Sequence, residues 1–383
     1  MSHSSQHPLG LDPADFPARD HLIYLNHAGT SPISGPAASA MKQFAEECAN
    51  HGAAAYAGWT AGARATRSSA ARLLGAAPEE VAFTKSTTQG LNLVALGLDW
   101  NPGDVIVAEE LTFPANWHPW KMAENRGATL AVWPERDYRY ELEDLETLLK
   151  KGNVRMVAAT SANFATGFRQ DMEAVGKLCR EYGALHCVDG IQTLGVHPID
   201  VKRCNIDFLS ADSHKWLLGP EGSAIFYVAR DRVPLFREDL IGWMGRQRYW
   251  EFEKLDLPPD PTARRFEEGS PNIAGILSMG ASLDLIQNTG VESIFPHNRT
   301  LCRRLEGHLE RNGWEIVTPR EDASAASIVS ARKEGADPAA VAKQLWERCK
   351  GWCVARRGFL RLSPHFYQTV EDMDRVGEAL EGL

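Results

Sequence analysis

The sequence has 383 residues, of which 44% are hydrophobic and 24% are charged, and these proportions exclude a largely disordered chain. Its formal net charge of −9 comes without any run of lysines and arginines, which argues against a nucleic-acid or anionic-membrane partner. At roughly 150 residues per domain the length predicts two or three domains, and no stretch approaches the ~20 apolar residues of a membrane span.

Short apolar runs alternate with helix-like stretches through the first two thirds of the chain. This alternation predicts an α/β fold with a mostly parallel, seven-stranded sheet covered on both faces. Ligands of such sheets bind where the strands end, so the residues just after each strand are the first candidates for a site. The expected strands are 81–84, 105–108, 128–133, 155–160, 185–188, 207–211 and 223–228, and the expected helices lie near 61–75, 88–97, 115–126, 141–150 and 171–182.

From about residue 275 the pattern changes to one dominated by helices, which indicates a smaller α+β domain. We expect a large domain over 18–285 and a small C-terminal domain over 286–383, joined by a polar N-terminal arm, 1–17. The helices of this part are expected at 275–288, 291–312, 338–350 and 369–381, with weaker strands near 315–318, 327–331 and 358–363.

The seven cysteines are scattered and form no CxxC motif. The simplest interpretation is reduced thiols in the cytoplasm, with no metal site. The first residues, MSHSSQHPLGLDPADFP, lack the basic and apolar regions of a signal peptide, which agrees with a cytoplasmic protein.

A strand-to-helix segment, FTKSTTQGLNL (83–93), places Ser86, Thr87 and Thr88 at the start of an apolar helix. Such a helix N-terminus, with hydroxyls and free backbone N–H groups, binds anions well. The alternative is an ordinary helix cap without a ligand. The chain contains neither GxGxxG nor GxxxxGK[ST], so a dinucleotide fold and a P-loop are not supported.

Two later strands are each followed by ionisable side chains. Asp189 in HCVDGIQT is either a helix cap or a carboxylate that keeps a pyridine ring nitrogen protonated, and Gln192 follows within hydrogen-bonding range of the same ring. Lys215 in FLSADSHKWLLGPEG is flanked by apolar residues, so burial would lower its pKa and make it a nucleophile. A surface lysine lying over an apolar patch is an equally good interpretation of this segment alone.

Taken together, five motifs resemble the class V aminotransferases, which are fold-type-I enzymes that depend on pyridoxal 5′-phosphate. The group includes cysteine desulfurases and isopenicillin-N-epimerase-like proteins. The resemblance runs from YLNHAGTSP to LRLSPHFY and so covers almost the whole chain, with the order and spacing of the motifs preserved. The motifs are YLNHAGTSP (24–32), FTKSTTQG (83–90), DGIQ with SADSHKWLLGPEG (189–222), RFEEGSPN (265–272) and LRLSPHFY (360–367).

The resemblance implies a role for each matching residue around the cofactor. Lys215 would form the Schiff base, Asp189 would pair with the pyridinium nitrogen and Gln192 would contact the phenolic oxygen. Phe113 would stack on the ring but cannot act as an acid or base. The phosphate would be held by Thr87, Thr88 and His214 and, from the neighbouring subunit of a homodimer with shared active sites, by Ser270; Asn163 lies near the position that contacts the ring oxygen.

The same resemblance assigns Arg361 to the α-carboxylate of an amino-acid substrate, as a bidentate partner. Arg356 matches a second arginine of many relatives, although the adjacent Arg357 is an alternative for that role. His27, in the N-terminal motif, is expected to line the substrate pocket. A solvated surface charge is the alternative for each arginine, and a structural hydrogen-bond donor is the alternative for the histidine.

The sequence departs from the desulfurase pattern in two places. Trp346 stands where those relatives carry a catalytic cysteine. Cys349 and Cys353 are nearby, but only seven residues separate Cys353 from Arg361. Phe113 stands where many desulfurases carry a histidine. Both departures weigh against desulfurase activity. We expect an aminotransferase or isopenicillin-N-epimerase-like enzyme acting on an amino acid or related amine. The alternatives are a C–S lyase or desulfurase of the cysteine or selenocysteine type and, outside enzymes, a non-catalytic binding module of the same fold.

Overall fold

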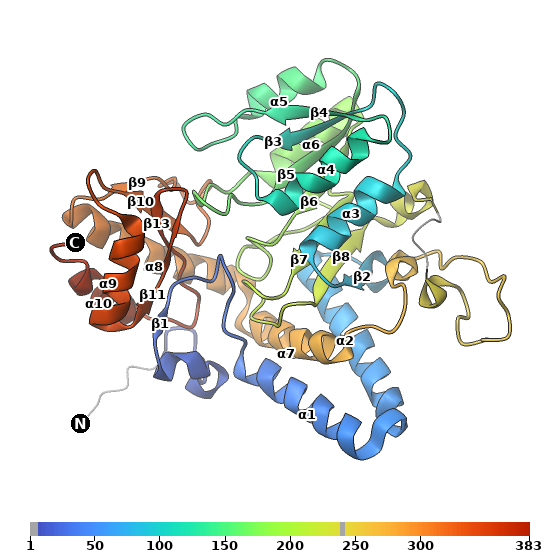
Figure 1. Ribbon diagram of the computed structural model, residues 1–383, viewed down its shortest axis with the longest axis horizontal. Helices are drawn as coiled ribbons and strands as arrows, with labels where there is room; N and C mark the ends of the chain where they lie inside the picture. The colour runs from blue at the N-terminus through green and yellow to red at the C-terminus, as the bar shows by residue number, and fades with distance from the viewer. Residues whose placement is uncertain (1–6, 238–241) are drawn as a thin grey trace.

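A seven-stranded sheet forms the centre of the large part of the molecule (Figure 1). The structure is a computed structural model that describes residues 7–237 and 242–383. The strand order is β2-β8-β7-β6-β5-β3-β4, in which β8 is antiparallel to both neighbours and every other pair is parallel. The strands are β2 (Val81–Thr84), β3 (Val105–Glu109), β4 (Thr129–Trp133), β5 (Val154–Thr160), β6 (Leu185–Asp189), β7 (Phe208–Asp212) and β8 (Ala224–Val228). The predicted fold class and all seven predicted strands are confirmed.

Helices cover both faces of this sheet because successive side chains of a strand point to opposite sides. On β2, for example, Val81 and Phe83 face one core layer, whereas Ala82 faces the other. The first layer contains α2 (Tyr56–Leu74), α5 (Leu142–Leu149), α6 (Met172–Tyr182) and α7 (Ile273–Thr289), and the second contains α3 (Thr87–Gly97) and α4 (His118–Glu124). Burial of each large apolar side chain in these layers stabilises the folded protein by about 1.5–3 kcal/mol relative to leaving it exposed.

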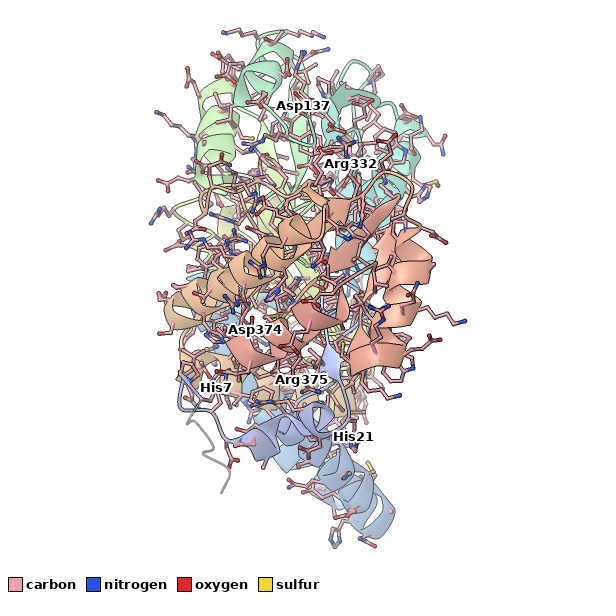
Figure 2. The ribbon with its side chains drawn as sticks, turned by 90° about the vertical axis from the view of Figure 1, so that its left-hand side faces the viewer. His7, His21, Asp137, Arg332, Asp374 and Arg375 are labelled. Carbon is pink, nitrogen blue, oxygen red and sulfur yellow. The ribbon has the colours of Figure 1, made fainter. Side chains whose placement is uncertain are left out.

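The C-terminal part packs three helices around a small antiparallel sheet of order β12-β13-β10-β9. Figure 2 faces this part, with Arg332 of β10 and Asp374 of α10 on the near side. Asp374 forms ion pairs with Arg304 and His308 of α8, which tie the two helices together. The elements are α8 (Val291–Arg311), β9 (Glu315–Ile316), β10 (Val329–Arg332), α9 (Pro338–Cys349), β12 (Val354–Arg356), β13 (Phe359–Leu362) and α10 (Val370–Ala379).

The N-terminal segment lies against the C-terminal part although it is far away in sequence. β1 (Ile23–Tyr24) pairs in parallel with β11 (Gly351–Trp352), and Asn26 forms a bridge with Ser363. In Figure 1 this blue segment runs beside the red one. The pairing brings the turn after β1 next to β13, where the predicted substrate-binding Arg361 lies.

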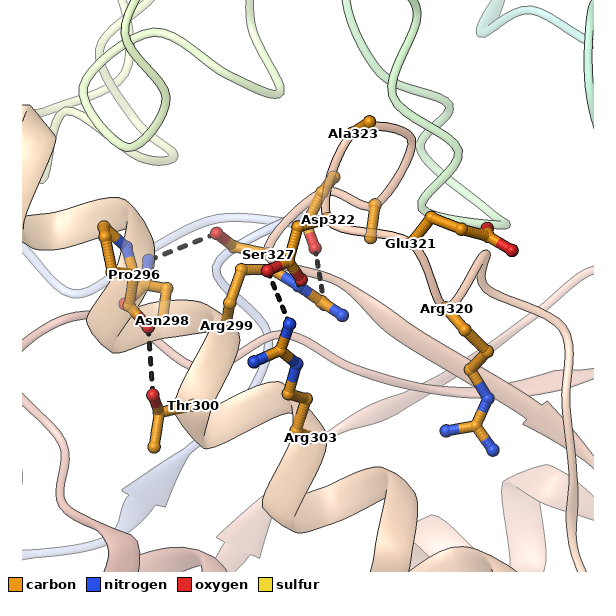
Figure 3. A network of polar contacts seen from close by, with 12 residues as sticks. Pro296, Asn298, Arg299, Thr300, Arg303, Arg320, Glu321, Asp322, Ala323 and Ser327 are labelled. Atoms are coloured by element: carbon orange, nitrogen blue, oxygen red, sulfur yellow. Dashed lines mark hydrogen bonds and ion pairs between the residues drawn. The ribbon is translucent and has the colours of Figure 1, made fainter.

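Polar contacts that range from buried to exposed join α8 to the loop that follows β9 (Figure 3). The Arg299 guanidinium donates to Asp322 at 3.1 Å and to the Ala326 carbonyl at 3.2 Å, and Arg303 pairs with the same aspartate. Arg169, from the large part, donates to the carbonyl of Asp322 at 2.9 Å. The network therefore connects the C-terminal part to the loop between β5 and α6.

One long helix was not expected from the sequence. α1 (Gly35–His51) begins at Ser34, whose hydroxyl accepts the Ala37 N–H, and has a proline in its first turn. Only Ala37 of this helix is fully buried, so its sequence lacks a clear apolar stripe, although the Ser-Gly-Pro start is a helix signal in itself. The predicted domain boundary after residue 285 falls inside α7 and stays a prediction. Within the described residues, no helix is long and apolar enough to span a membrane.

Candidate active site

A cavity of about 280 Å³ lies where β6 and β7 end and α3 begins. Its lining includes residues from the turn after β1, from the ends of β6 and β7, from the start of α3 and from the β12–β13 hairpin. The cavity brings together eight residues that the sequence singled out: Thr87, Thr88, Phe113, Asp189, His214, Lys215, Arg356 and Arg361.

Lys215 follows β7 and is 7% exposed. Burial lowers the pKa of its ammonium group to about 8, an effect that Asp189 opposes and Arg361 increases. Its Nζ lies 5.4 Å from the centroid of the Phe113 ring. A substantial fraction of Lys215 is therefore a neutral amine near pH 8, which is the form that acts as a nucleophile or base.

Asp189 is the last residue of β6 and is 1% exposed. Its Oδ1 accepts the backbone N–H of Ile191 at 3.1 Å. Burial raises the pKa of the carboxyl group to about 6, while this hydrogen bond and the Lys215 charge oppose the shift. The carboxyl group is thus ionised at neutral pH, but burial makes its negative charge unfavourable. A cationic group bound in the cavity would stabilise that charge.

The N-terminus of α3 supplies an anion-binding surface. Ser86 caps the helix by accepting the Gln89 N–H, and Ser86, Thr87 and Thr88 all line the cavity. The Thr87 hydroxyl accepts the backbone N–H of Asp212 at 2.9 Å, so its own hydrogen is available to a ligand. Nearby, His214 Nδ1 lies 3.1 Å from Asp212 Oδ1. Together, the hydroxyls, the helix dipole and the histidine suit a phosphate group.

Two phenylalanine rings form the apolar wall of the cavity. Phe113 is 42% exposed, and its ring meets that of Phe164 edge-on, with centroids 5.2 Å apart. The exposed face of Phe113 is available to stack on a planar ligand.

Arg361 enters the cavity from β13 and is 1% exposed. Its Nη1 donates to the Phe164 carbonyl at 2.7 Å and its Nη2 donates to Asn26 Oδ1 at 2.8 Å. Burial lowers the pKa of the guanidinium to about 9, and Arg356 adds to this shift. Both of its hydrogen-bond partners are neutral, so a carboxylate ligand would give it the anionic partner that it lacks.

Three other predicted residues are not among those that line the cavity. Gln192 donates to the Ala28 carbonyl and accepts from the Trp216 indole, so both ends of its amide are used inside the protein. Asn163 stabilises its own turn by accepting the N–H groups of Ala165 and Thr166.

His27 is the third of these residues and is fully buried. Its Nδ1 contacts the Ser363 carbonyl at 2.7 Å and its Nε2 contacts the Tyr367 hydroxyl at 2.9 Å. Burial lowers the pKa of the His27 imidazole to about 3, so the ring is neutral and joins the N- and C-terminal segments.

Ser270 is exposed and lines a separate cavity of about 190 Å³ with Lys85 and Gln89. In this single chain it does not lie with Lys215, which leaves its expected contact with a second subunit as a prediction.

Three residues at the site were not assigned from the sequence. Phe164 follows Asn163 directly, and Asn26 directly precedes His27, so each stands one position from a predicted residue. Asp212 lies in the same SADSHK run as Lys215 and lines the cavity. The motifs therefore indicated the right segments, but they did not show which side chains in those segments point into the cavity.

None of the seven cysteines, all of them in described segments, lines this cavity. Cys353 is buried in the C-terminal core, and burial raises the pKa of its thiol to about 12. Cys349 donates to the Leu345 carbonyl within α9. Neither thiol is placed or ionised as a nucleophile for this cavity.

Comparisons with known proteins point to one family. Residues 23–376 match the family model described as aminotransferase class-V. A Bacillus subtilis protein named uncharacterized aminotransferase YcbU is 30% identical over 80% of each chain. A Dickeya dadantii cysteine desulfurase is 31% identical over 78% of this chain and 68% of the relative. The apo structure of a Thermococcus onnurineus cysteine desulfurase superimposes with a TM-score of 0.86 and 26% identity, covering 96% of this chain and 97% of the other.

Proposed function

The chain belongs to the aminotransferase class-V family, and from this membership we propose that it is an aminotransferase or epimerase-like enzyme that acts on an α-amino acid. Members of this family are enzymes that depend on pyridoxal 5′-phosphate, so this is the cofactor of the chain. The observation that carries the proposal is the position of one buried amine, Lys215, in the same cavity as a buried carboxyl group, Asp189.

The side chains of the cavity fit this cofactor. The hydroxyls of Thr87 and Thr88 and the α3 N-terminus offer donors to a phosphate, and Phe113 offers a flat apolar surface to a pyridine ring. The Asp189 carboxyl group is buried, its pKa is raised, and it forms no ion pair within the described residues, so a protonated ring nitrogen would stabilise its charge. When bound, pyridoxal phosphate supplies an aldehyde that condenses with amines and a ring that withdraws electrons from the substrate α-carbon.

The residues of the chain then divide the work between binding and proton transfer. Arg361 holds the substrate α-carboxylate and so fixes the orientation of the α-carbon. Lys215 takes the α-proton on its neutral amine and returns a proton to the substrate. Asp189 keeps its partner nitrogen protonated. The Phe113–Phe164 pair gives this part of the cavity an apolar wall.

Transamination, elimination and racemisation all begin with removal of the α-proton, and Lys215 is the amine in the described lining that can take it. The carboxyl groups there, Asp189 and Asp212, are the last residues of β6 and β7. We place transamination before C–S cleavage because no cysteine is among the described lining residues.

Cleavage of a C–S bond is the second candidate, because relatives and solved neighbours are named cysteine desulfurases. With no cysteine among the lining residues, such a reaction would release sulfur without transferring it to a protein thiol. We also propose that the enzyme works as a homodimer, in which Ser270 of one chain reaches the phosphate of the other.

The test is a product assay with a matched pair of variants. Purified protein is offered a panel of amino acids together with an acceptor keto acid, and the new keto acid, the aminated acceptor, sulfide, ammonia and racemised product are measured in parallel. We expect keto acid from the wild type and from Lys121→Ala, whose lysine makes a surface ion pair with Glu124, and no product from Lys215→Ala.

Borohydride reduction followed by peptide mapping locates the cofactor independently of turnover. We expect the label on Lys215. Label on Lys85 or Lys121 would contradict the role of Lys215. Release of sulfide together with ammonia and pyruvate, with no amino group transferred to an acceptor keto acid, would replace transamination by the second candidate.

A further inference from the structure

Three arginines gather on the β12–β13 hairpin beside the cavity. The two strands are antiparallel with Val354 opposite Arg361, so Arg356 and Arg361 project from the same face as diagonal neighbours. Diagonal neighbours of this kind are about 7–8 Å apart. Both arginines line the cavity. One small ligand in the cavity can therefore meet both side chains.

The turn of the hairpin separates the role of Arg357 from that of Arg356. Arg357 and Gly358 have φ angles of 51° and 81°, which makes a tight two-residue turn with left-handed backbone at both positions. This conformation is uncommon for arginine. It carries the Arg357 guanidinium over the Phe164 ring, 5.6 Å from the centroid. Arg357 thus packs on the wall of the cavity, whereas Arg356 faces its interior.

No carboxylate of the described residues forms an ion pair with any of these arginines. Arg361 donates to two neutral oxygen atoms, and the exposed side chain of Arg356 has no hydrogen-bond partner in the described structure. The two guanidinium groups repel each other, since Arg356 lowers the pKa of Arg361. A ligand with one anionic group would neutralise only one of them, and a ligand with two would neutralise both.

This inference rests on the proposed function. We propose that the substrate is an amino acid with an anionic side chain, whose α-carboxylate binds Arg361 and whose side-chain carboxylate or sulfinate binds Arg356. Recognition by the planar donors of arginine suits both kinds of oxyanion. A neutral amino acid gains less in the cavity because it offers no anionic group to Arg356, which is otherwise only hydrated. The specificity of the enzyme therefore depends on a residue that plays no part in proton transfer.

The first test uses unreactive ligands, so that it does not depend on turnover. Succinate and butyrate have four carbons each and differ by one carboxylate. We expect calorimetry on the holoprotein to show succinate binding about ten- to a hundredfold more tightly than butyrate, the effect of one charge-assisted contact. Arg356→Gln should abolish this preference. Arg357→Gln, the matched control on the same hairpin, should change it by about twofold or less.

The second test compares turnover of aspartate and cysteine sulfinate with that of asparagine and cysteine. We expect the anionic substrates to have the higher kcat/KM and Arg356→Gln to lower that advantage at least tenfold, mainly through KM. An advantage for the sulfinate over aspartate identifies the side-chain group as a sulfinate, and the reverse identifies a carboxylate.

The outcomes separate the two proposals. Equal binding of succinate and butyrate, or a preference that survives in Arg356→Gln, overturns the inference, even if neutral amino acids are turned over as the proposed function requires. A succinate preference that depends on Arg356 supports the inference. If no amino acid is then turned over, the proposed function fails while the site for two anionic groups remains.

Discussion

At the end of β3, Glu109 is 1% exposed, and its Oε1 accepts the backbone N–H of Thr160 at 3.0 Å. Its Oε2 has no partner in the described structure. Burial raises the pKa of this carboxyl group to about 8, and the charge of Asp189 raises it further. Glu109 therefore holds a proton at neutral pH in the folded protein, whereas in the unfolded chain it is ionised.

This difference makes stability depend on pH. Because the pKa of Glu109 is raised on folding, its contribution is complete below its unfolded pKa and is lost as the pH rises toward 8. We expect Glu109→Gln to lessen the fall in unfolding free energy between pH 5 and 8 by up to about 1.4 kcal/mol per pH unit. Urea unfolding across this range measures the slope. An exposed control, Glu334→Gln, should keep the wild-type slope, and equal slopes in all three proteins would contradict the assignment.

At the scale of elements, the position of α3 depends on the absence of a side chain at Gly90. A Cβ atom there would lie 2.3 Å from Ser210 Oγ and 3.0 Å from the Phe226 ring. The helix can therefore lie close to β7 and β8, and this closeness allows Thr87 to bond the backbone at the end of β7. The geometry of the anion-binding surface follows from that contact.

We expect Gly90→Ala to displace α3 and weaken the binding of pyridoxal phosphate. Overpacking costs about 1–3 kcal/mol, against a gain of about 1 kcal/mol from better helix propensity, so a net loss of stability is expected. Gly58→Ala in α2 is the control, because nothing lies within 4 Å of a Cβ atom at that position. Denaturant unfolding and cofactor titration should separate the two variants, and identical behaviour would show that α3 is free to shift.

At the scale of the whole molecule, the cavity with Lys215 and the cavity with Ser270 are separate in one chain. If a second chain brings its Ser270 to the phosphate, the cofactor contacts both chains. A ligand that binds the dimer better than the monomer must then stabilise the dimer. The same linkage requires that dilution weaken cofactor binding.

We therefore expect removal of the cofactor to weaken association, as followed by sedimentation of holo and apo protein over a dilution series. Ser270→Ala should weaken the cofactor's effect on association and leave the fold intact, because the side chain is exposed in the single chain. A stable monomer with full cofactor occupancy would eliminate the shared site. Ser270 and Pro271 would then be only the turn that precedes α7.

Much of the site was predictable because its signals are local. Lys215 follows an apolar strand, Asp189 ends one, and Thr87 and Thr88 begin a helix. The few residues around each of them are enough to predict a position at the carboxyl edge of the sheet. The direction of a side chain within a motif was not predictable in the same way. Asn26 and His27 are adjacent, yet Asn26 bonds Arg361 and His27 bonds the segment around Tyr367.

The sequence by itself determined the α/β class, the seven strands of the central sheet and the family, because hydrophobic periodicity and motif spacing are properties of neighbouring residues. Only the tertiary structure decided which polar side chains reach the cavity. Arg361 is oriented by Asn26, 335 positions away, and Arg357 by the ring of Phe164. Such contacts depend on how distant segments pack, and a change of one position in a turn or strand reverses the direction of the side chain.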